Sequence, residues 1–185
     1  MEKKDEKNGE KKKFFDVKKL AIAGLLTAAI TIVTAYIKIP VINGYVHIGD
    51  GLIYFAASLL GPFAALPAGI GSMLADLIAG YPQYILPTLI VKSLMGAISG
   101  LVLLLTNKTK KKWLKMMLRI VAIVICEGIM VIGYHIAGEI IYGEAAAIGE
   151  LIGNLCQAGV GILTGILFLS VASYFKHNGK YGWND

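Results

Sequence analysis

Polar and ionisable side chains stand within stretches of this sequence that are otherwise apolar enough for a membrane. Residues 45–100 are the densest case and contain His47, Asp50, Asp76, Tyr81, Gln83, Tyr84 and Lys92. Charged groups at membrane depth are costly unless they are paired or hydrated, so each of them marks a candidate functional site. Glycines and prolines interrupt the same segment, and irregular backbone is tolerated at that depth only where it is buried in protein or lines a cavity. The segment predicts a polar pocket inside a helical membrane protein.

A second group of polar residues, Glu150, Asn154 and Gln157, has the spacing i, i+4, i+7. This spacing places the three side chains on one face of a helix. A carboxylate and two amides offer both acceptors and donors, which suits a polar ligand that contains a ring. We therefore expect these residues to line the pocket rather than to join helices.

His135 and Glu139 are four residues apart, and we include both among the candidate ligand contacts. Two residues do not make a zinc site and no third ligand follows at suitable spacing, so no metal site is predicted. Together with the deeper Glu127 they offer an alternative of another class, the acid and base of an intramembrane enzyme acting on a lipid-soluble substrate. No GxxxxGK[ST] phosphate loop, GxSxG elbow or HExxH helix occurs in the sequence. The residues present therefore favour binding over catalysis.

Asp76 and Lys92 lie on consecutive predicted helices, about one and two turns from the same membrane face. At about 1.5 Å per residue their backbones have similar depth. We predict an ion pair between them that shapes the pocket. Asp50 follows His47 by three residues and is typical of a helix N-cap, while His47 is a further candidate contact.

Tyr81 and Tyr84 flank Pro82 and Gln83 between two predicted helices. Tyrosine is enriched where membrane meets water, which accounts for part of the aromatic content of these loops. The two rings are also placed to close over a flat ligand by stacking. We predict that residues 80–84 form a lid.

The elements that must position these residues are membrane helices. Of the 185 residues, 56% are hydrophobic and 16% are charged, against about 25% charged in a typical soluble domain. Runs of about 20 apolar residues are long enough to cross the hydrocarbon core. We predict an all-α integral membrane protein, a bundle of six transmembrane helices, at residues 17–37, 50–60, 63–79, 85–106, 114–141 and 148–175. The second of these is short for a crossing.

Three parts are expected along the chain. Residues 14–176 form the six-helix membrane domain. Residues 1–13 mix lysine with acidic residues and predict a disordered cytoplasmic tail. Residues 177–185 form a short second cytoplasmic tail.

The net charge of +6 is concentrated in clusters. Eight lysines fall within residues 1–19, six basic residues fall within 108–119, and Lys176 and Lys180 follow the last apolar run. Basic clusters beside membrane spans mark the cytoplasmic side. The clusters share one side only if an even number of spans separates them, so we expect six spans with both termini in the cytoplasm. This rule explains the distribution better than nucleic-acid binding does, and no nucleic acid is expected as a partner.

Small residues of the first predicted helix, Ala21, Gly24, Ala28 and Thr31, recur at spacings of three and four. Small residues let helix backbones approach closely in a membrane. The pattern alone fits internal packing and a docking face for another membrane protein equally well.

Several short motifs carry a family resemblance. They are VHIGDG at 46–51, LGP at 60–62, GIGS at 69–72, ADL at 75–77, GYP at 80–82, PTLIVK at 87–92 and Gly96. With these motifs the chain resembles the substrate-binding (S) component of an energy-coupling factor (ECF) vitamin transporter, of the riboflavin or hydroxymethylpyrimidine type. The motifs cover the first half of the chain, and the size, helix plan and basic ends extend the resemblance to most of it.

The resemblance implies a substrate-capture subunit in the bacterial plasma membrane, without enzymatic activity or a cofactor of its own. Such a subunit binds a scarce vitamin under its outer loops and docks on a transmembrane scaffold (T) subunit and two ATPases, which use the ATP. The expected ligand is hydroxymethylpyrimidine or a pyridoxine-like molecule, with riboflavin as the alternative. Docking uses a small-residue AxxxA motif, from which this chain departs because Leu25 follows Ala21 at i+4. Gly24 and Ala28 supply an equivalent pair.

Overall fold

The computed structural model describes residues 17–41 and 44–177, with side chains through Tyr174. The tails predicted at 1–13 and 177–185 therefore lie outside the described residues, apart from His177, which ends the last helix.

Six α-helices make up almost all of the described chain. They are α1 (Val17–Tyr36), α2 (Gly49–Leu60), α3 (Ala65–Ala79), α4 (Ile85–Thr106), α5 (Lys112–Tyr142) and α6 (Glu144–His177), with short 3-10 turns η1 (Gly61–Ala64) and η2 (Pro82–Tyr84). Each helix lies within a few residues of its predicted range, because apolar runs bounded by glycine and proline mark helix ends well. The helical class of the prediction is confirmed.

The predicted six crossings are confirmed only in part. Five segments are long and apolar enough to cross a membrane, and one of them, Gly49–Ala79, joins α2, η1 and α3. α2 has 12 residues, which span about 18 Å against a hydrocarbon core of about 30 Å. Most of its residues are buried, and it packs against α1, α4 and α6. α2 is thus a short central helix inside the bundle.

A β-hairpin separates α1 from α2, where the all-α prediction had only a loop. Strands β1 (Lys38–Val41) and β2 (Gly44–His47) pair antiparallel, with Lys38 opposite His47 and Val41 opposite Gly44. The segment is rich in β-branched and aromatic residues, which favour extended backbone. The prediction was wrong here because only helical periods were considered in an apolar chain.

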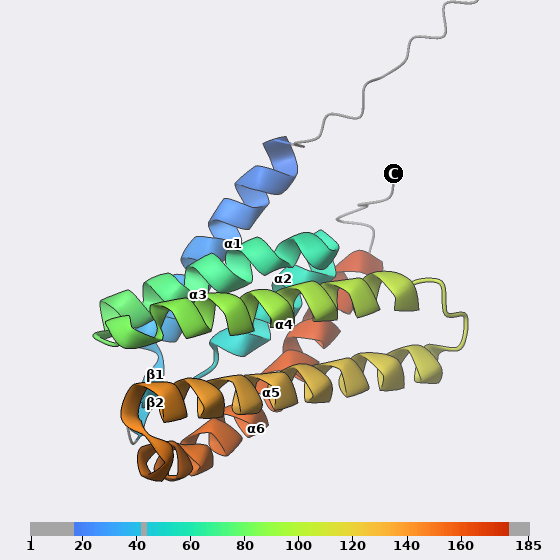
Figure 1. Cartoon of the computed structure of the whole chain (residues 1–185). Helices are drawn as coiled ribbons and strands as arrows, with labels where there is room; N and C mark the ends of the chain where they lie inside the picture. Colours follow the sequence, from blue (N-terminus) through green and yellow to red (C-terminus); the bar gives the residue numbers. More distant parts are fainter. Residues whose placement is uncertain (1–16, 42–43, 178–185) are drawn as a thin grey trace, which may run out of the picture.

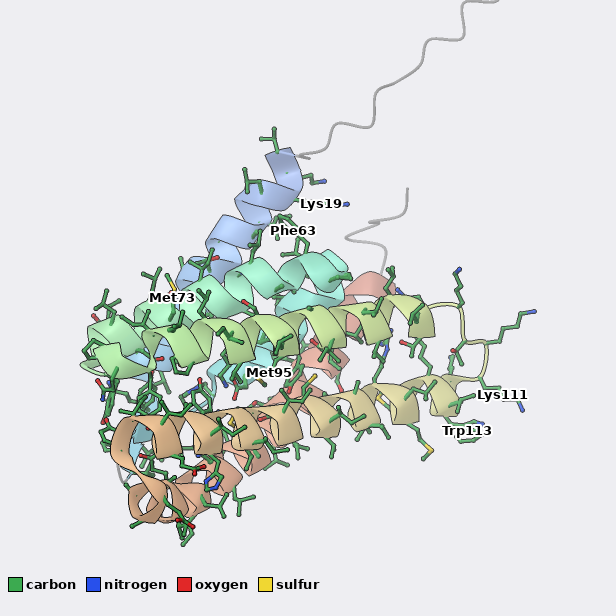
Figure 2. All side chains as sticks on the ribbon, in the orientation of Figure 1. Lys19, Phe63, Met73, Met95, Lys111 and Trp113 are labelled. Carbon is green, nitrogen blue, oxygen red and sulfur yellow. The ribbon has the colours of Figure 1, made fainter. Side chains whose placement is uncertain are left out.

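The hairpin lies at the same end of the bundle as two of the helix connections (Figure 1). These are the α3–α4 connection through η2 and the tight α5–α6 turn at Gly143, whose φ is +88°. The α2–α3 turn and the loop from α4 to α5 lie at the opposite end, where Lys111 and Trp113 are seen (Figure 2). The end that carries the hairpin is called the hairpin end below.

Close backbone contacts hold α2, α3 and α4 together. Gly61 ends α2 with φ of +59°, a backbone conformation that glycine adopts readily. A Cβ on Gly100 of α4 would overlap the carbonyl oxygen of Gly61. Fully buried apolar side chains fill the centre, among them Met95, which lies between α4 and α5 (Figure 2).

α1 packs along α3 by one face only. Thr31 is buried there, and its hydroxyl donates to the carbonyl oxygen of Gly71 at 2.9 Å. Ala21, Gly24 and Ala28, nearer the start of the helix, are exposed. The predicted stripe is therefore covered by the bundle only toward the end of α1, at Thr31, and is exposed over the first turns of the helix.

Candidate ligand-binding site

A cavity of about 60 Å³ lies between the hairpin and the adjoining ends of α3, α4, α5 and α6. Eight of the ten predicted ligand contacts line it: His47, Asp76, Tyr81, Tyr84, Lys92, Glu150, Asn154 and Gln157. They come from five segments of the chain that only the tertiary fold brings together. Whether they bind a ligand stays a prediction.

Lys92, which lines the cavity, belongs to a buried ion pair. Lys92 Nζ lies 2.6 Å from Asp50 Oδ1, and both side chains are at most 1% exposed. The predicted partner of Lys92 was Asp76. Asp76 and Lys92 do both line the cavity, but α2 packs inside the bundle and places Asp50 against the Lys92 ammonium. Asp50 is also not an N-cap, since α2 has Ile48 at that position with no capping side chain.

Gln157 ties the hairpin and α2 to α6. Its side-chain oxygen accepts from the backbone N–H of His47 at 2.7 Å, and its Nε2 donates to the His47 carbonyl at 3.2 Å. The same Nε2 donates to Asp50 Oδ2 at 2.5 Å. One amide therefore satisfies three buried partners, using both its donor and its acceptor capacity.

His47 is neutral in this setting. Its Nδ1 accepts a hydrogen bond from the backbone N–H of Gly49 at 3.1 Å. Burial, partly offset by Asp50, lowers the pKa of the imidazole from 6.5 to about 4. At neutral pH the ring therefore adds no positive charge to the cavity.

Aromatic rings cover the cavity below the hairpin. Tyr45 and Tyr81 have ring centroids 5.3 Å apart. The Tyr45 hydroxyl donates to Asp76 Oδ1 at 2.6 Å. Burial, and then the charge of Asp76, raise the pKa of this hydroxyl, so Tyr45 remains a donor. Tyr81 donates to the carbonyl of Gly44 at 3.3 Å, which joins the predicted lid to the hairpin.

A second aromatic group comes from η2 and α5. The Tyr84 ring lies 6.0 Å from that of Tyr134 and 6.2 Å from that of Tyr142. Its hydroxyl donates to Glu150 Oε2 at 2.9 Å. The hydroxyls of Thr88 and Tyr134 pair at 2.9 Å. Four tyrosines therefore line the cavity, with other polar groups between the rings.

His135 and Glu139 lie outside the cavity. His135 Nδ1 is 3.4 Å from the carbonyl oxygen of Ala147, and Glu139 is exposed. The inward face of α5 instead presents Met130 and Tyr134 to the cavity. One residue turns a helix by about 100°, so Tyr134 and His135 point in different directions. Tyr134 lies seven residues after the buried Glu127, about two helical turns, so the two side chains share the inward face of α5.

Seven further lining residues were not among the predicted contacts: Val41, Gly44, Tyr45, Thr88, Met130, Tyr134 and Gly153. Tyr45 stands two residues before His47, and alternate residues of a strand share a face. That pattern was available in the sequence once a strand was considered. The apolar Met130 carries no comparable signal.

Glu127 lies in the core rather than on the cavity. It is 1% exposed, and its Oε1 accepts from the Tyr54 hydroxyl at 2.8 Å. Gly161 of α6 leaves room for this carboxyl, because a Cβ there would overlap it. Glu127 is therefore not assembled with His135 and Glu139 into an acid–base group. Among the described residues, no cluster of three or more His, Cys, Asp or Glu is placed to hold a metal ion.

Comparison with known families shows what the chain is similar to. The family model described as "ECF-type riboflavin transporter, S component" matches residues 14–174. The chain belongs to this family. The resemblance drawn from the sequence motifs is thereby confirmed.

Two relatives of this S component cover most of its length. An uncharacterized protein of Pyrococcus woesei is 34% identical over 140 residues, covering 74% of this chain and 89% of its own. The thiamine precursor transporter HmpT of Lactococcus lactis is 30% identical over 152 residues, covering 80% of this chain and 83% of its own. The S component is accordingly a substrate-binding subunit for transport of a vitamin or vitamin precursor, and not an enzyme. It is a multi-pass protein of the plasma membrane.

Proposed function

We propose that this S component captures a small heteroaromatic vitamin or precursor, such as hydroxymethylpyrimidine or a pyridoxine-like molecule, in the cavity at the hairpin end. The observation that carries the proposal is the cavity itself. It is lined by tyrosine rings and supplied with carboxyl, amide and ammonium groups. Ligand sites typically combine such apolar walls with a few fixed polar groups.

The size of the cavity favours a one-ring ligand. About 60 Å³ is free, whereas occupied ligand pockets commonly measure about 300–1000 Å³. Any ligand must therefore displace lining side chains, and a three-ring ligand must displace more of them. HmpT is named as a transporter of a thiamine precursor, which supports a pyrimidine. The description of the matching family supports riboflavin as the alternative.

The hairpin end faces the outside in this proposal, and both termini lie in the cytoplasm. The loop between α4 and α5 at the opposite end carries basic residues, and basic clusters mark the cytoplasmic side. The connections at the hairpin end have Lys38 as their one Lys or Arg among described residues. A ligand then enters from outside under the hairpin and residues 80–84.

Delivery in this proposal requires partner subunits. The exposed face of α1 with Ala21, Gly24 and Ala28 docks on a transmembrane scaffold (T) subunit, which carries two ATPases. Small side chains on this face permit close helix contact. This S component needs no cofactor of its own, since the ATPases use the ATP.

The ligand is tested directly on the purified chain. The S component in detergent is titrated with hydroxymethylpyrimidine, pyridoxine and riboflavin by calorimetry, and co-purified small molecules are identified by mass spectrometry. We expect tight binding of one of the one-ring compounds. Asn154→Leu should abolish binding, while Leu155→Ala, an exposed neighbour on α6, should not. Binding of riboflavin alone would select the alternative, and failure of all three compounds would refute the proposed ligand class.

The orientation is tested by cysteine labelling in intact cells. In a background with Cys126 and Cys156 replaced by alanine, Lys110→Cys places a thiol in the loop between α4 and α5. A membrane-permeant maleimide should label it and an impermeant one should not. Labelling of intact cells by the impermeant reagent would reverse the proposed orientation.

A further inference from the structure

We propose, on the basis of the function above, that the cavity selects an uncharged or cationic ring that presents N–H or O–H donors, and rejects phosphorylated or carboxylated forms of the same vitamin. Asp76 and Glu150 are the residues that make this selection.

The charge around the cavity comes from one ammonium and from the carboxyl groups of Asp76 and Glu150. Lys92 is the lining residue with a full positive charge, and Asp50 neutralises it at 2.6 Å. His47 is neutral because it accepts a hydrogen bond at Nδ1 from the Gly49 N–H. Neither Asp76 nor Glu150 has an ion-pair partner among the described residues. Among the lining residues, the carboxyl groups of Asp76 and Glu150 therefore face no unpaired cation.

Two carboxyl oxygens of the cavity are left without hydrogen-bond partners within the part of the chain that the structure describes. Oδ2 of Asp76 and Oε1 of Glu150 are buried without a hydrogen-bond partner, although the other oxygen of each accepts from a tyrosine hydroxyl. The two side chains are 7% and 5% exposed. The Thr88 hydroxyl lies beside Asp76 and pairs with the hydroxyl of Tyr134. Buried acceptors without partners are costly. A ligand with donors at these points would supply the missing hydrogen bonds.

A third atom adds one donor to the set. Nδ2 of Asn154 is buried without an acceptor and lines the same cavity. Two acceptors and one donor between tyrosine rings match a ring nitrogen flanked by amino or hydroxyl groups. Four tyrosines, Tyr45, Tyr81, Tyr84 and Tyr134, supply flat walls for such a ring.

The same atoms oppose an anion. A phosphate ester carries a charge of about −1.5 to −2 near neutral pH, and it would enter a cavity whose one ammonium is already paired. Placing like charges together opposes binding strongly. We expect the ester to bind about 100-fold or more weakly than the parent alcohol.

The test compares each compound with its phosphate ester on the full chain in detergent. The pairs are hydroxymethylpyrimidine, pyridoxine and riboflavin, each against its monophosphate. A ratio of dissociation constants of about 100 or more for the pair whose parent binds would support the inference. A ratio below this, with the parent bound tightly, would overturn the inference and leave the proposed function standing. Failure of all parent compounds to bind would overturn both.

Variants separate charge selection from general damage to the site. Asp76→Asn with Glu150→Gln removes both carboxyls and keeps their size. The ratio between ester and parent should then fall about tenfold or more. Glu144→Gln, which removes an exposed carboxyl in the first turn of α6, should leave the ratio unchanged. If the double variant lowers both affinities equally, the two residues do not select charge and the assignment is wrong.

Discussion

Lys92 Nζ and Asp50 Oδ1 are 2.6 Å apart at the centre of the bundle, and neither side chain reaches solvent. Asp50 lies in the first turn of the short α2, and Lys92 lies about two turns into α4 from the hairpin end. The pair thus joins the shortest of the six helices to one of the long apolar helices of the bundle. Lys92 also lines the cavity, so the pair links the stability of the bundle to the shape of the site.

Removing one partner of this pair should destabilise the protein severely. Lys92→Met leaves the Asp50 carboxylate buried without a cation, which typically costs about 3–5 kcal/mol. Thermal unfolding in detergent should show a large drop in midpoint. The double variant Lys92→Met with Asp50→Asn removes both charges and should recover much of the loss. A Lys92→Met protein as stable as the parent would contradict the ion pair.

The hairpin should open when its tie to α6 is cut. Gln157→Leu removes the hydrogen bonds to the His47 N–H, the His47 carbonyl and Asp50 Oδ2. Each buried group left without a partner costs about 1–3 kcal/mol. Hydrogen exchange of residues 44–49 should accelerate by about tenfold or more.

The matched control for this change is Cys156→Leu. It alters the adjacent, exposed side chain of α6 and should leave exchange in residues 44–49 unchanged. Equal exchange in parent and Gln157→Leu would show that the hairpin is held by other contacts.

Stability should fall with acid partly through His47. The pKa of His47 is about 4 in the folded protein because of burial, and about 6.5 in the unfolded chain. The unfolded chain therefore takes up the proton first, so stability is lost as the pH falls from about 6.5 to about 4. The full loss attributable to this group is on the order of 3 kcal/mol.

His47→Asn provides the comparison, because its side-chain oxygen can still accept from the Gly49 N–H. The unfolding midpoint of the parent should fall more steeply with pH than that of the variant between pH 6.5 and 4. Parallel curves for the two proteins would show that His47 does not titrate in this range.

A large side chain on the exposed face of α1 should block assembly and spare binding. Ala28 is exposed, and a tryptophan there disturbs no packed neighbour within the described chain. Ala28→Trp should bind ligand with unchanged affinity but fail to co-purify with the scaffold and ATPase subunits. Leu104→Trp on α4, where the side chain is also exposed, should assemble normally. Full assembly of Ala28→Trp would move the docking face elsewhere.

Much of the architecture follows from the sequence alone. Apolar runs with glycine and proline at their ends define six helices to within a few residues, since a membrane helix satisfies its own backbone hydrogen bonds. Polar side chains inside those runs identify most of the residues that line the cavity, because polar groups at membrane depth are stable only when they are buried together inside the protein. The short motifs around Asp50, Asp76 and Lys92 identify the family.

Only the tertiary structure decided which of these side chains meet. Equal depth made Asp76 the expected partner of Lys92, but depth does not determine how a third helix inserts, and α2 brings Asp50 to the ammonium group instead. Likewise Tyr134 and His135 are neighbours in sequence, yet about 100° of helix rotation places one in the cavity and the other outside. Periodicity determines where helices run and which residues share a face. Their rotation and mutual placement depend on long-range packing, which no local pattern in the sequence encodes.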